Sequence, residues 1–143
     1  MMDKFFMLCL LIPMAVEDIR EQKLNFWWMI FWGMAGVIWH LIWKQADWME
    51  IAAAFLPGIV LLTAGLLGKG VGVGDGILFL AIGGIGMAEI SFRLLMKSLF
   101  LCAGTGLIIR SVKRADWNLR LPFAPFAALG YLIDCFVKLV LIQ

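Results

Sequence analysis

Long apolar segments, separated by short polar or glycine-rich stretches, make up most of the chain. A helix that crosses a bilayer needs about 20 predominantly apolar residues, and each of these segments approaches or reaches that length. The pattern therefore predicts an all-α integral membrane protein with about six transmembrane helices, in a single domain spanning residues 1–143. The predicted spans are residues 1–16, 24–43, 48–67, 76–90, 94–109 and 122–142, with a tight turn at Ser91, Phe92 and Arg93.

The composition favours a membrane protein over a soluble one. Apolar residues make up 64% of the chain and charged residues 15%, with a mean hydropathy of +0.98, whereas a soluble domain is nearer half apolar and a quarter charged. These proportions exclude a soluble enzyme and a disordered chain. A net charge of +2 is too small for a nucleic-acid-binding module. Cys9, Cys102 and Cys135 lie in apolar segments, so we interpret them as buried thiols and not as disulfides or metal ligands.

Basic residues predict the orientation of the chain. Cytoplasmic loops of membrane proteins carry an excess of Lys and Arg. Seven of the 12 basic residues lie in the loops after the first, third and fifth predicted helices, and five lie on the opposite side. We therefore expect those three loops in the cytoplasm and both termini outside, in the inner (cytoplasmic) membrane. Tryptophans near predicted helix ends, such as Trp43 and Trp48, are typical of the membrane interface, and the single histidine, His40, falls in the outer group.

Other polar residues in or near the apolar segments are interpreted as structural. Asp134 and Lys138 are four residues apart on the last predicted helix, where they are expected to form an ion pair. Glu89 lies near the far end of the fourth helix and is expected to reach the interface. Glycines in the fourth and fifth helices allow close helix packing.

Two aspartates, Asp18 and Asp75, are the strongest candidates for chemistry. Asp18 ends the first predicted helix and Asp75 opens the fourth, so an odd number of crossings puts both at the cytoplasmic face. Ionisable groups at membrane depth are costly and are usually functional or paired. Two facing carboxyl groups share one proton. The ionised member activates a water as a base and the protonated member polarises a carbonyl, which is aspartyl proteolysis without metal or cofactor.

Glycines stand at every second position before Asp75, at 68, 70, 72 and 74. Glycine permits close approach of the backbone to another group, so this loop is suited to presenting a catalytic carboxylate. Two simpler interpretations stay open at this point: a solvated loop carboxylate at Asp18, beside Glu17 and Glu21, and a flexible interhelical loop at the glycines. A nucleotide-binding loop is not favoured, because no Gly-Lys-Ser/Thr follows.

The residues around these aspartates resemble a known family. Gly72-Val73-Gly74-Asp75 matches the GxGD motif of membrane aspartyl proteases, and Asp18-Ile19-Arg20 follows the first apolar run. The stretch Leu121-Pro122-Phe123-Ala124-Pro125-Phe126, with Gly130, is similar to the one that opens the last helix of the type IV prepilin peptidases and the related archaeal preflagellin peptidases. Three matches in the right order cover most of the chain, which resembles the catalytic domain of this family and its GxGD aspartyl protease fold.

This resemblance implies an activity, a site and a substrate. Such enzymes remove the short basic leader of prepilins or pseudopilins at the cytoplasmic face, just before a hydrophobic helix, and they use no cofactor. By this resemblance the catalytic pair is Asp18 and Asp75, and the expected partners are the prepilin-like substrate and membrane lipid. The residues expected to shape the site are Gly72, Gly74, Asn25, Pro122, Phe123 and Pro125, with Glu17 added because its charge suits a basic leader.

The sequence departs from the family pattern in three places. Leu24-Asn25 stands where the family often has Pro-Asn. Ile77 stands where a lysine often follows the second aspartate. The amino-terminal methyltransferase region with paired cysteines, found in the larger bacterial members, has no counterpart here, so we do not expect this chain to methylate the processed pilin.

Other functions stay open from the sequence alone. The chain fits a catalytically inactive homologue that serves as a pilus or secretion assembly partner. It also fits a small ion-coupled transporter subunit in which Asp18 and Asp75 bind cations or protons, although no inverted repeat relates residues 1–70 and 71–143. Proteases like presenilin or signal peptide peptidase share the GxGD motif, but they are much longer and place their first aspartate in a different sequence.

Overall fold

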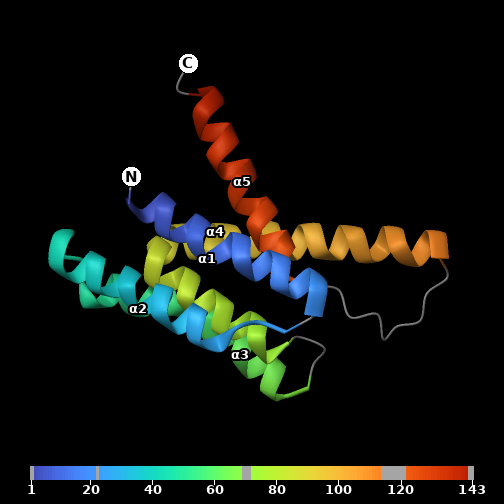
Figure 1. The fold of residues 1–143 in the computed structure, drawn as a ribbon, viewed down its shortest axis with the longest axis horizontal. Coiled ribbons are helices and arrows are strands. Elements are labelled where there is room, and N and C mark those ends of the chain that lie inside the picture. Colours follow the sequence, from blue (N-terminus) through green and yellow to red (C-terminus); the bar gives the residue numbers. More distant parts are fainter. Residues whose placement is uncertain (1, 22, 69–71, 114–121, 142–143) are drawn as a thin grey trace.

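The computed structural model describes residues 2–21, 23–68, 72–113 and 122–141, and within these ranges the chain is all-helical with no strand. Figure 1 shows the arrangement of the helices. The predicted apolar segments form helices whose ends mostly fall within a few residues of the predicted ones. The elements are α1 (Met2–Glu21), α2 (Phe26–Trp43), α3 (Trp48–Leu66), α4 (Val73–Lys113) and α5 (Ala124–Leu141).

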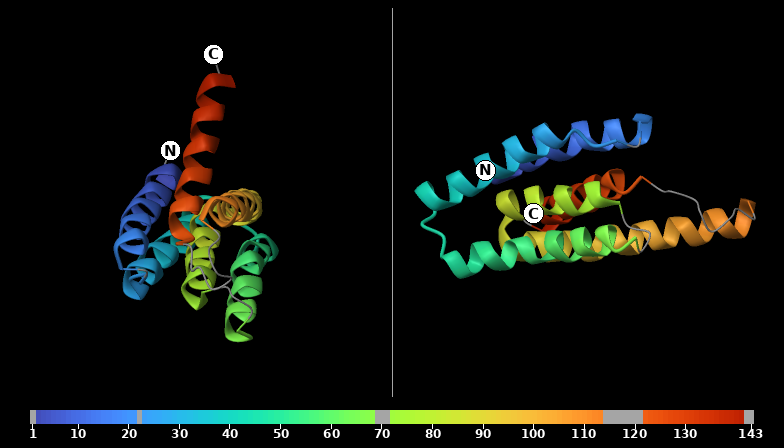
Figure 2. Two further views of the ribbon diagram at one scale, coloured as in Figure 1. Left: turned by 90° about the vertical axis from the view of Figure 1, so that its right-hand side faces the viewer. Right: turned by 90° about the horizontal axis from the view of Figure 1, so that it is seen from below.

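A break at Met87 divides α4 into two helices. Met87 has left-handed, extended backbone (φ 59, ψ −176) inside the helix, and Figure 2 shows the parts on either side of the bend running in different directions. The turn predicted at Ser91, Phe92 and Arg93 is therefore wrong, because those residues lie within the second half of α4 (88–113). Ser91 is fully buried there, and Arg93 pairs with Glu89 one helical turn earlier at 2.7 Å.

Three helices are long and apolar enough to cross a membrane, judged by length and composition. They are Phe26–Trp43, Trp48–Leu66 and Val73–Ile109. The last has 37 residues, nearly twice the length that one crossing needs, and it contains the break at Met87. These helices indicate an all-α membrane protein, and the count of six spans stays a prediction.

The first half of α4 (73–86) is the centre of the fold. It packs between α2 and α3, and its side chains Leu78, Phe79 and Ile82 are fully buried. A β-carbon on Gly36 of α2 would lie only 2.7 Å from the Ile85 α-carbon, so the backbones of α2 and α4 are in contact. Small residues that allow such contact are the usual basis of helix association in lipid, where the hydrophobic effect does not drive helices together.

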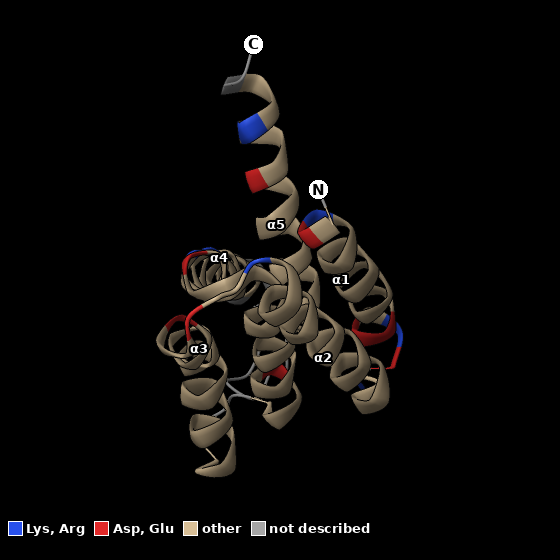
Figure 3. Ribbon diagram, turned by 90° about the vertical axis from the view of Figure 1, so that its left-hand side faces the viewer, with Lys and Arg blue, Asp and Glu red and all other residues tan. Residues whose placement is uncertain are grey.

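Charged residues are sparse along the outer faces of the helices. Figure 3 shows long uncharged stretches on α2 and α3, as expected for surfaces that face lipid. On α5, Asp134 pairs with Lys97 from the second half of α4. The predicted pairing of Asp134 with Lys138 is therefore wrong: the partner comes from a neighbouring helix, because α5 packs against α4.

We expect Gly36→Ala to lower the free energy of unfolding by about 1–3 kcal/mol, because the added methyl group must push apart two backbones that touch. Thermal unfolding of the purified protein in detergent measures the effect. Gly104→Ala is the matched control, since a β-carbon there meets nothing within 4 Å. Equal melting temperatures for the two variants would contradict this account of the core.

Candidate active site

Asp18 lies in the last turn of α1 and is buried, with 7% of its surface exposed. Its Oδ2 accepts a hydrogen bond from the backbone N–H of Ala124 at 2.9 Å. Ala124 is the first residue of α5, so the carboxyl group lies at a helix N-terminus, where unpaired N–H groups and the helix dipole favour negative charge. The Asp18 side chain thereby links the end of α1 to the start of α5.

Two opposing effects act on the charge of Asp18, which lies outside the three candidate membrane spans. Burial, the larger effect, raises the pKa of Asp18 above its ordinary value of 3.8. The backbone N–H groups of Ala124 and Phe123 lower the pKa, because they stabilise the ionised form. The net direction is upward, so Asp18 holds its proton to a higher pH than a free carboxyl group does.

Asp75 lies in the first turn of α4, and the glycines of the GxGD motif give room to Asp75 and to the neighbouring Leu24. The Asp75 amide donates a hydrogen bond to the Gly72 carbonyl at 3.1 Å. A β-carbon on Gly72 would lie 3.0 Å from Asp75 Oδ2, and one on Gly74 would lie 3.2 Å from Leu24 Cδ1. Any larger residue at Gly72 would therefore crowd the carboxyl group itself.

The fold brings Asp18 and Asp75 into electrostatic range of each other, although they belong to different helices. Two carboxyl groups in such a relation do not both ionise readily, because each charge opposes the other. The arrangement thus allows a dyad that holds one proton, with an acid and a base available at the same place.

Aromatic packing joins the helix that carries Asp75 to the segment that contacts Asp18. The ring of Phe79, in the first half of α4, lies 5.8 Å from the ring of Phe123 at a tilt of 50°. Phe123 immediately precedes Ala124, whose amide donates the hydrogen bond to Asp18. Only 8% of the surface of Phe123 is exposed. Pro122 and Pro125, both half-buried, flank this stretch. The proline-phenylalanine segment therefore lies beside Asp18 and contacts α4 through Phe123.

The remaining predicted site residues have simpler surroundings. Asn25 is exposed and caps α2, because its side-chain oxygen accepts the Trp28 amide at 3.3 Å. Glu17 is half-exposed on α1 beside Asp18. Ile77, in place of the family's lysine, packs partly buried against the apolar core. Asn25 thus has a local structural role, while Glu17 leaves an acidic group next to the buried aspartate.

Two neighbours of the site, Cys102 and Leu24, are not among the predicted site residues. Cys102, in the second half of α4, lies within electrostatic range of Asp75, and Leu24 contacts the Gly74 position. Cys102 reaches the site because α4 bends at Met87 and returns. The sequence predicted a turn between the two halves of α4, four residues after the observed break, but not which residue of the returning helix would lie near Asp75.

Comparisons of the chain with models of protein families, with curated proteins and with solved structures found no match. The resemblance to prepilin peptidases therefore stays an expectation that depends on the three sequence motifs.

We expect Asp18→Asn to raise the melting temperature relative to the unsubstituted protein, and by more as the pH rises. Because burial raises the pKa of Asp18, the folded state binds the proton more tightly than the unfolded state does. The stability that this tighter proton binding contributes is fully present below about pH 3.8. It is lost as the pH rises through the pKa that Asp18 has in the folded state. The uncharged amide avoids this loss.

Thermal unfolding between about pH 4 and pH 7 measures the difference. Asp47→Asn is the control, because Asp47 is exposed and its side chain makes no capping hydrogen bond. A difference between Asp18→Asn and the unsubstituted protein that stays constant or shrinks with rising pH would contradict the burial argument.

Proposed function

We propose that this protein is a membrane aspartyl endopeptidase that removes the leader peptide of prepilin-like or pseudopilin-like proteins at the cytoplasmic face of the inner membrane. The observation that carries the proposal is that Asp75 lies within electrostatic range of Asp18, whose carboxyl group is at the N-terminus of α5. The GxGD motif and the proline-phenylalanine segment contribute to the same place. A paired acid and base near an apolar surface suits hydrolysis of a peptide bond next to a membrane-embedded helix.

The two aspartates take different roles in this proposal. Asp18 accepts the Ala124 N–H and lies at a helix N-terminus, which favours its ionised form, so it removes a proton from the attacking water. Asp75 holds the shared proton and polarises the scissile carbonyl. The water oxygen bonds to the carbonyl carbon, the carbon–nitrogen bond breaks, and a proton from the dyad goes to the leaving amine.

The acidic residues at the end of α1 support a basic substrate. Glu17 is half-exposed and Glu21 is exposed, and both lie within one turn of Asp18. A leader rich in Lys or Arg would be attracted to this end of α1. The apolar outer faces of the helices would be in lipid, where the hydrophobic segment of a prepilin also lies.

We expect the purified protein to cut a prepilin that carries a basic leader and a Gly-Phe junction, with the loss of the leader followed by mass spectrometry. Asp18→Asn and Asp75→Asn should each lower the rate by at least about 100-fold, because each removes the acid or the base. Asp47→Asn, a matched change in an exposed residue, should retain full activity. Melting temperatures of the variants show that they are folded.

The outcomes separate the proposal from its alternatives. Cleavage that survives both substitutions would refute the catalytic assignment. A folded protein that cuts none of several prepilins would refute the peptidase proposal and favour an inactive assembly partner. Ion flux in reconstituted vesicles that depends on Asp18 and Asp75 would favour an ion-coupled transporter.

We expect Ala124→Pro to move the acid limb of the pH–rate profile to higher pH by about 1–2 units. Proline has no N–H, and it is tolerated at the first position of a helix, so the change removes mainly the donor to Asp18. A hydrogen bond to a charged group contributes about 1.5–3 kcal/mol, and its loss raises the pKa of the base. Ala124→Gly keeps the N–H and is the control. An unshifted profile in Ala124→Pro would contradict the role given to this amide.

A further inference from the structure

A polar cavity of about 310 Å³ lies at the opposite end of α1 from Asp18. Asp3, which lines it, is fifteen residues before Asp18 on the same helix, about 22 Å at 1.5 Å per residue. The cavity is therefore separate from the aspartate pair. The residues that define it come from four helices and the turn after α2, and they are Asp3, His40, Lys44, Glu50, Met87 and Glu89.

His40 lines this cavity and has a ring nitrogen without a hydrogen-bond partner among the described residues. It is 2% exposed, and its Nε2 lies 2.8 Å from the Ile85 carbonyl oxygen. Since a carbonyl only accepts, Nε2 carries the hydrogen, and Nδ1 of the neutral ring is an acceptor. Nδ1 is buried and has no partner among the described residues. Buried polar atoms in native proteins are nearly always paired, so this one calls for a donor.

The break in α4 adds further acceptors. The cavity is lined by Gly86 and Met87, where the first half of α4 ends. Carbonyl groups in the last turn of a helix have no N–H group four residues later to accept a hydrogen bond from. They also carry partial negative charge. His40 satisfies the Ile85 carbonyl. The backbone at Met87 is left-handed, a conformation that costs of order 1–3 kcal/mol at a non-glycine residue and clusters at functional sites.

Carboxylates outnumber cations around the cavity. Asp3, Glu50 and Glu89 contribute three negative charges, and Lys44 is the lining cation. Lys44 is already paired with Asp3, and Glu89 is paired with Arg93. Among the described residues no three His, Cys, Asp or Glu side chains are placed to hold a metal ion. The three carboxylates and the His40 nitrogen without a partner match the chemistry of an organic cation that donates hydrogen bonds.

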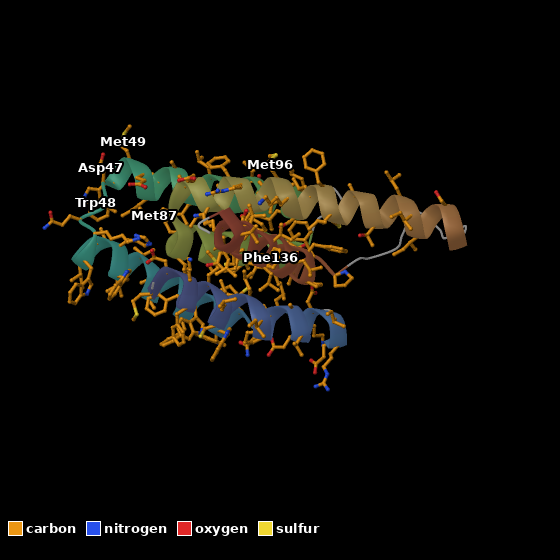
Figure 4. All side chains as sticks on the ribbon, turned by 90° about the horizontal axis from the view of Figure 1, so that it is seen from above. Asp47, Trp48, Met49, Met87, Met96 and Phe136 are labelled. Atoms are coloured by element: carbon orange, nitrogen blue, oxygen red, sulfur yellow. The ribbon has the colours of Figure 1, made fainter. Side chains whose placement is uncertain are left out.

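The position of the cavity points to the membrane interface. Trp43 and Trp48 are more than 70% exposed, and tryptophans in such positions lie at the level of lipid headgroups. Figure 4 shows Asp47, Trp48 and Met49 at the same end of the molecule as Met87. The volume of the cavity is several times the roughly 30 Å³ that a water molecule occupies. The cavity therefore has room for a small headgroup.

We propose that this cavity binds a primary ammonium group, carried either by an aminophospholipid headgroup or by a free small amine. The ammonium donates its hydrogens to His40 Nδ1, to the Glu50 carboxylate and to the free carbonyls at the break in α4. This site is independent of the proposed peptidase activity.

The test measures thermal unfolding of the delipidated full chain in nonionic detergent. Phosphatidylethanolamine should raise the melting temperature by about 4 °C or more. Phosphatidylcholine with the same acyl chains should not, because its quaternary nitrogen has no hydrogen to donate. Free ethanolamine, compared with choline, distinguishes the sources: stabilisation by ethanolamine as well as by the lipid identifies a free amine as sufficient, and stabilisation by the lipid alone identifies the headgroup.

Two lining variants make the test specific. Glu50 is exposed, so Glu50→Gln should leave the fold intact. It should raise the half-saturating concentration of phosphatidylethanolamine at least about tenfold. His40→Leu should do the same by removing the Nδ1 acceptor, and Asp47→Asn should leave the value unchanged. Equal stabilisation by the two phospholipids would overturn the proposal, and so would an undiminished response in Glu50→Gln.

Discussion

The break in α4 at Met87 decides which parts of the chain meet. A straight helix of 41 residues would be about 60 Å long and would carry α5 away from α1. Because the helix bends, its second half returns past Asp75, where Cys102 lies, and α5 begins beside Asp18. The strained backbone is held by close contacts of the first half of α4 with α2 and α3. The same break lines the polar cavity at the other end.

Burial of the aspartate pair lowers the stability of the folded protein, and packing elsewhere in the fold must offset this loss. Burying a carboxyl group is unfavourable unless it is hydrogen-bonded, and the amides of Ala124 and Phe123 compensate Asp18 only in part, since the pKa of Asp18 stays raised. Groups placed this way are typical of sites that use a proton, where local stability is given up for chemistry. Tight packing around Phe79 and Ile82 supplies the compensating stability.

The positions of the helices follow from the lengths of the apolar runs, and they were predictable for that reason. A turn between the fourth and fifth predicted helices was also predictable, but its position was not: Ser91 and Arg93 are more polar than Met87, yet Ser91 is buried within a helix and Arg93 pairs along it. Left-handed backbone at one residue leaves no trace in hydropathy. The contact of Asp18 with Ala124 joins residues 106 positions apart, so it depends on the whole fold and not on any local pattern.

Cross-linking tests most directly whether Asp18 and Asp75 form one site. Asp18→Cys and Asp75→Cys would be combined in a chain whose Cys9, Cys102 and Cys135 are replaced by serine, then treated with a short bifunctional thiol reagent. Peptide mass spectrometry should find the two positions joined to each other. Asp47→Cys combined with Asp75→Cys is the control, and it should stay unjoined. If both cysteines of the first pair react with a monofunctional reagent but are never joined, the two aspartates do not form a catalytic pair.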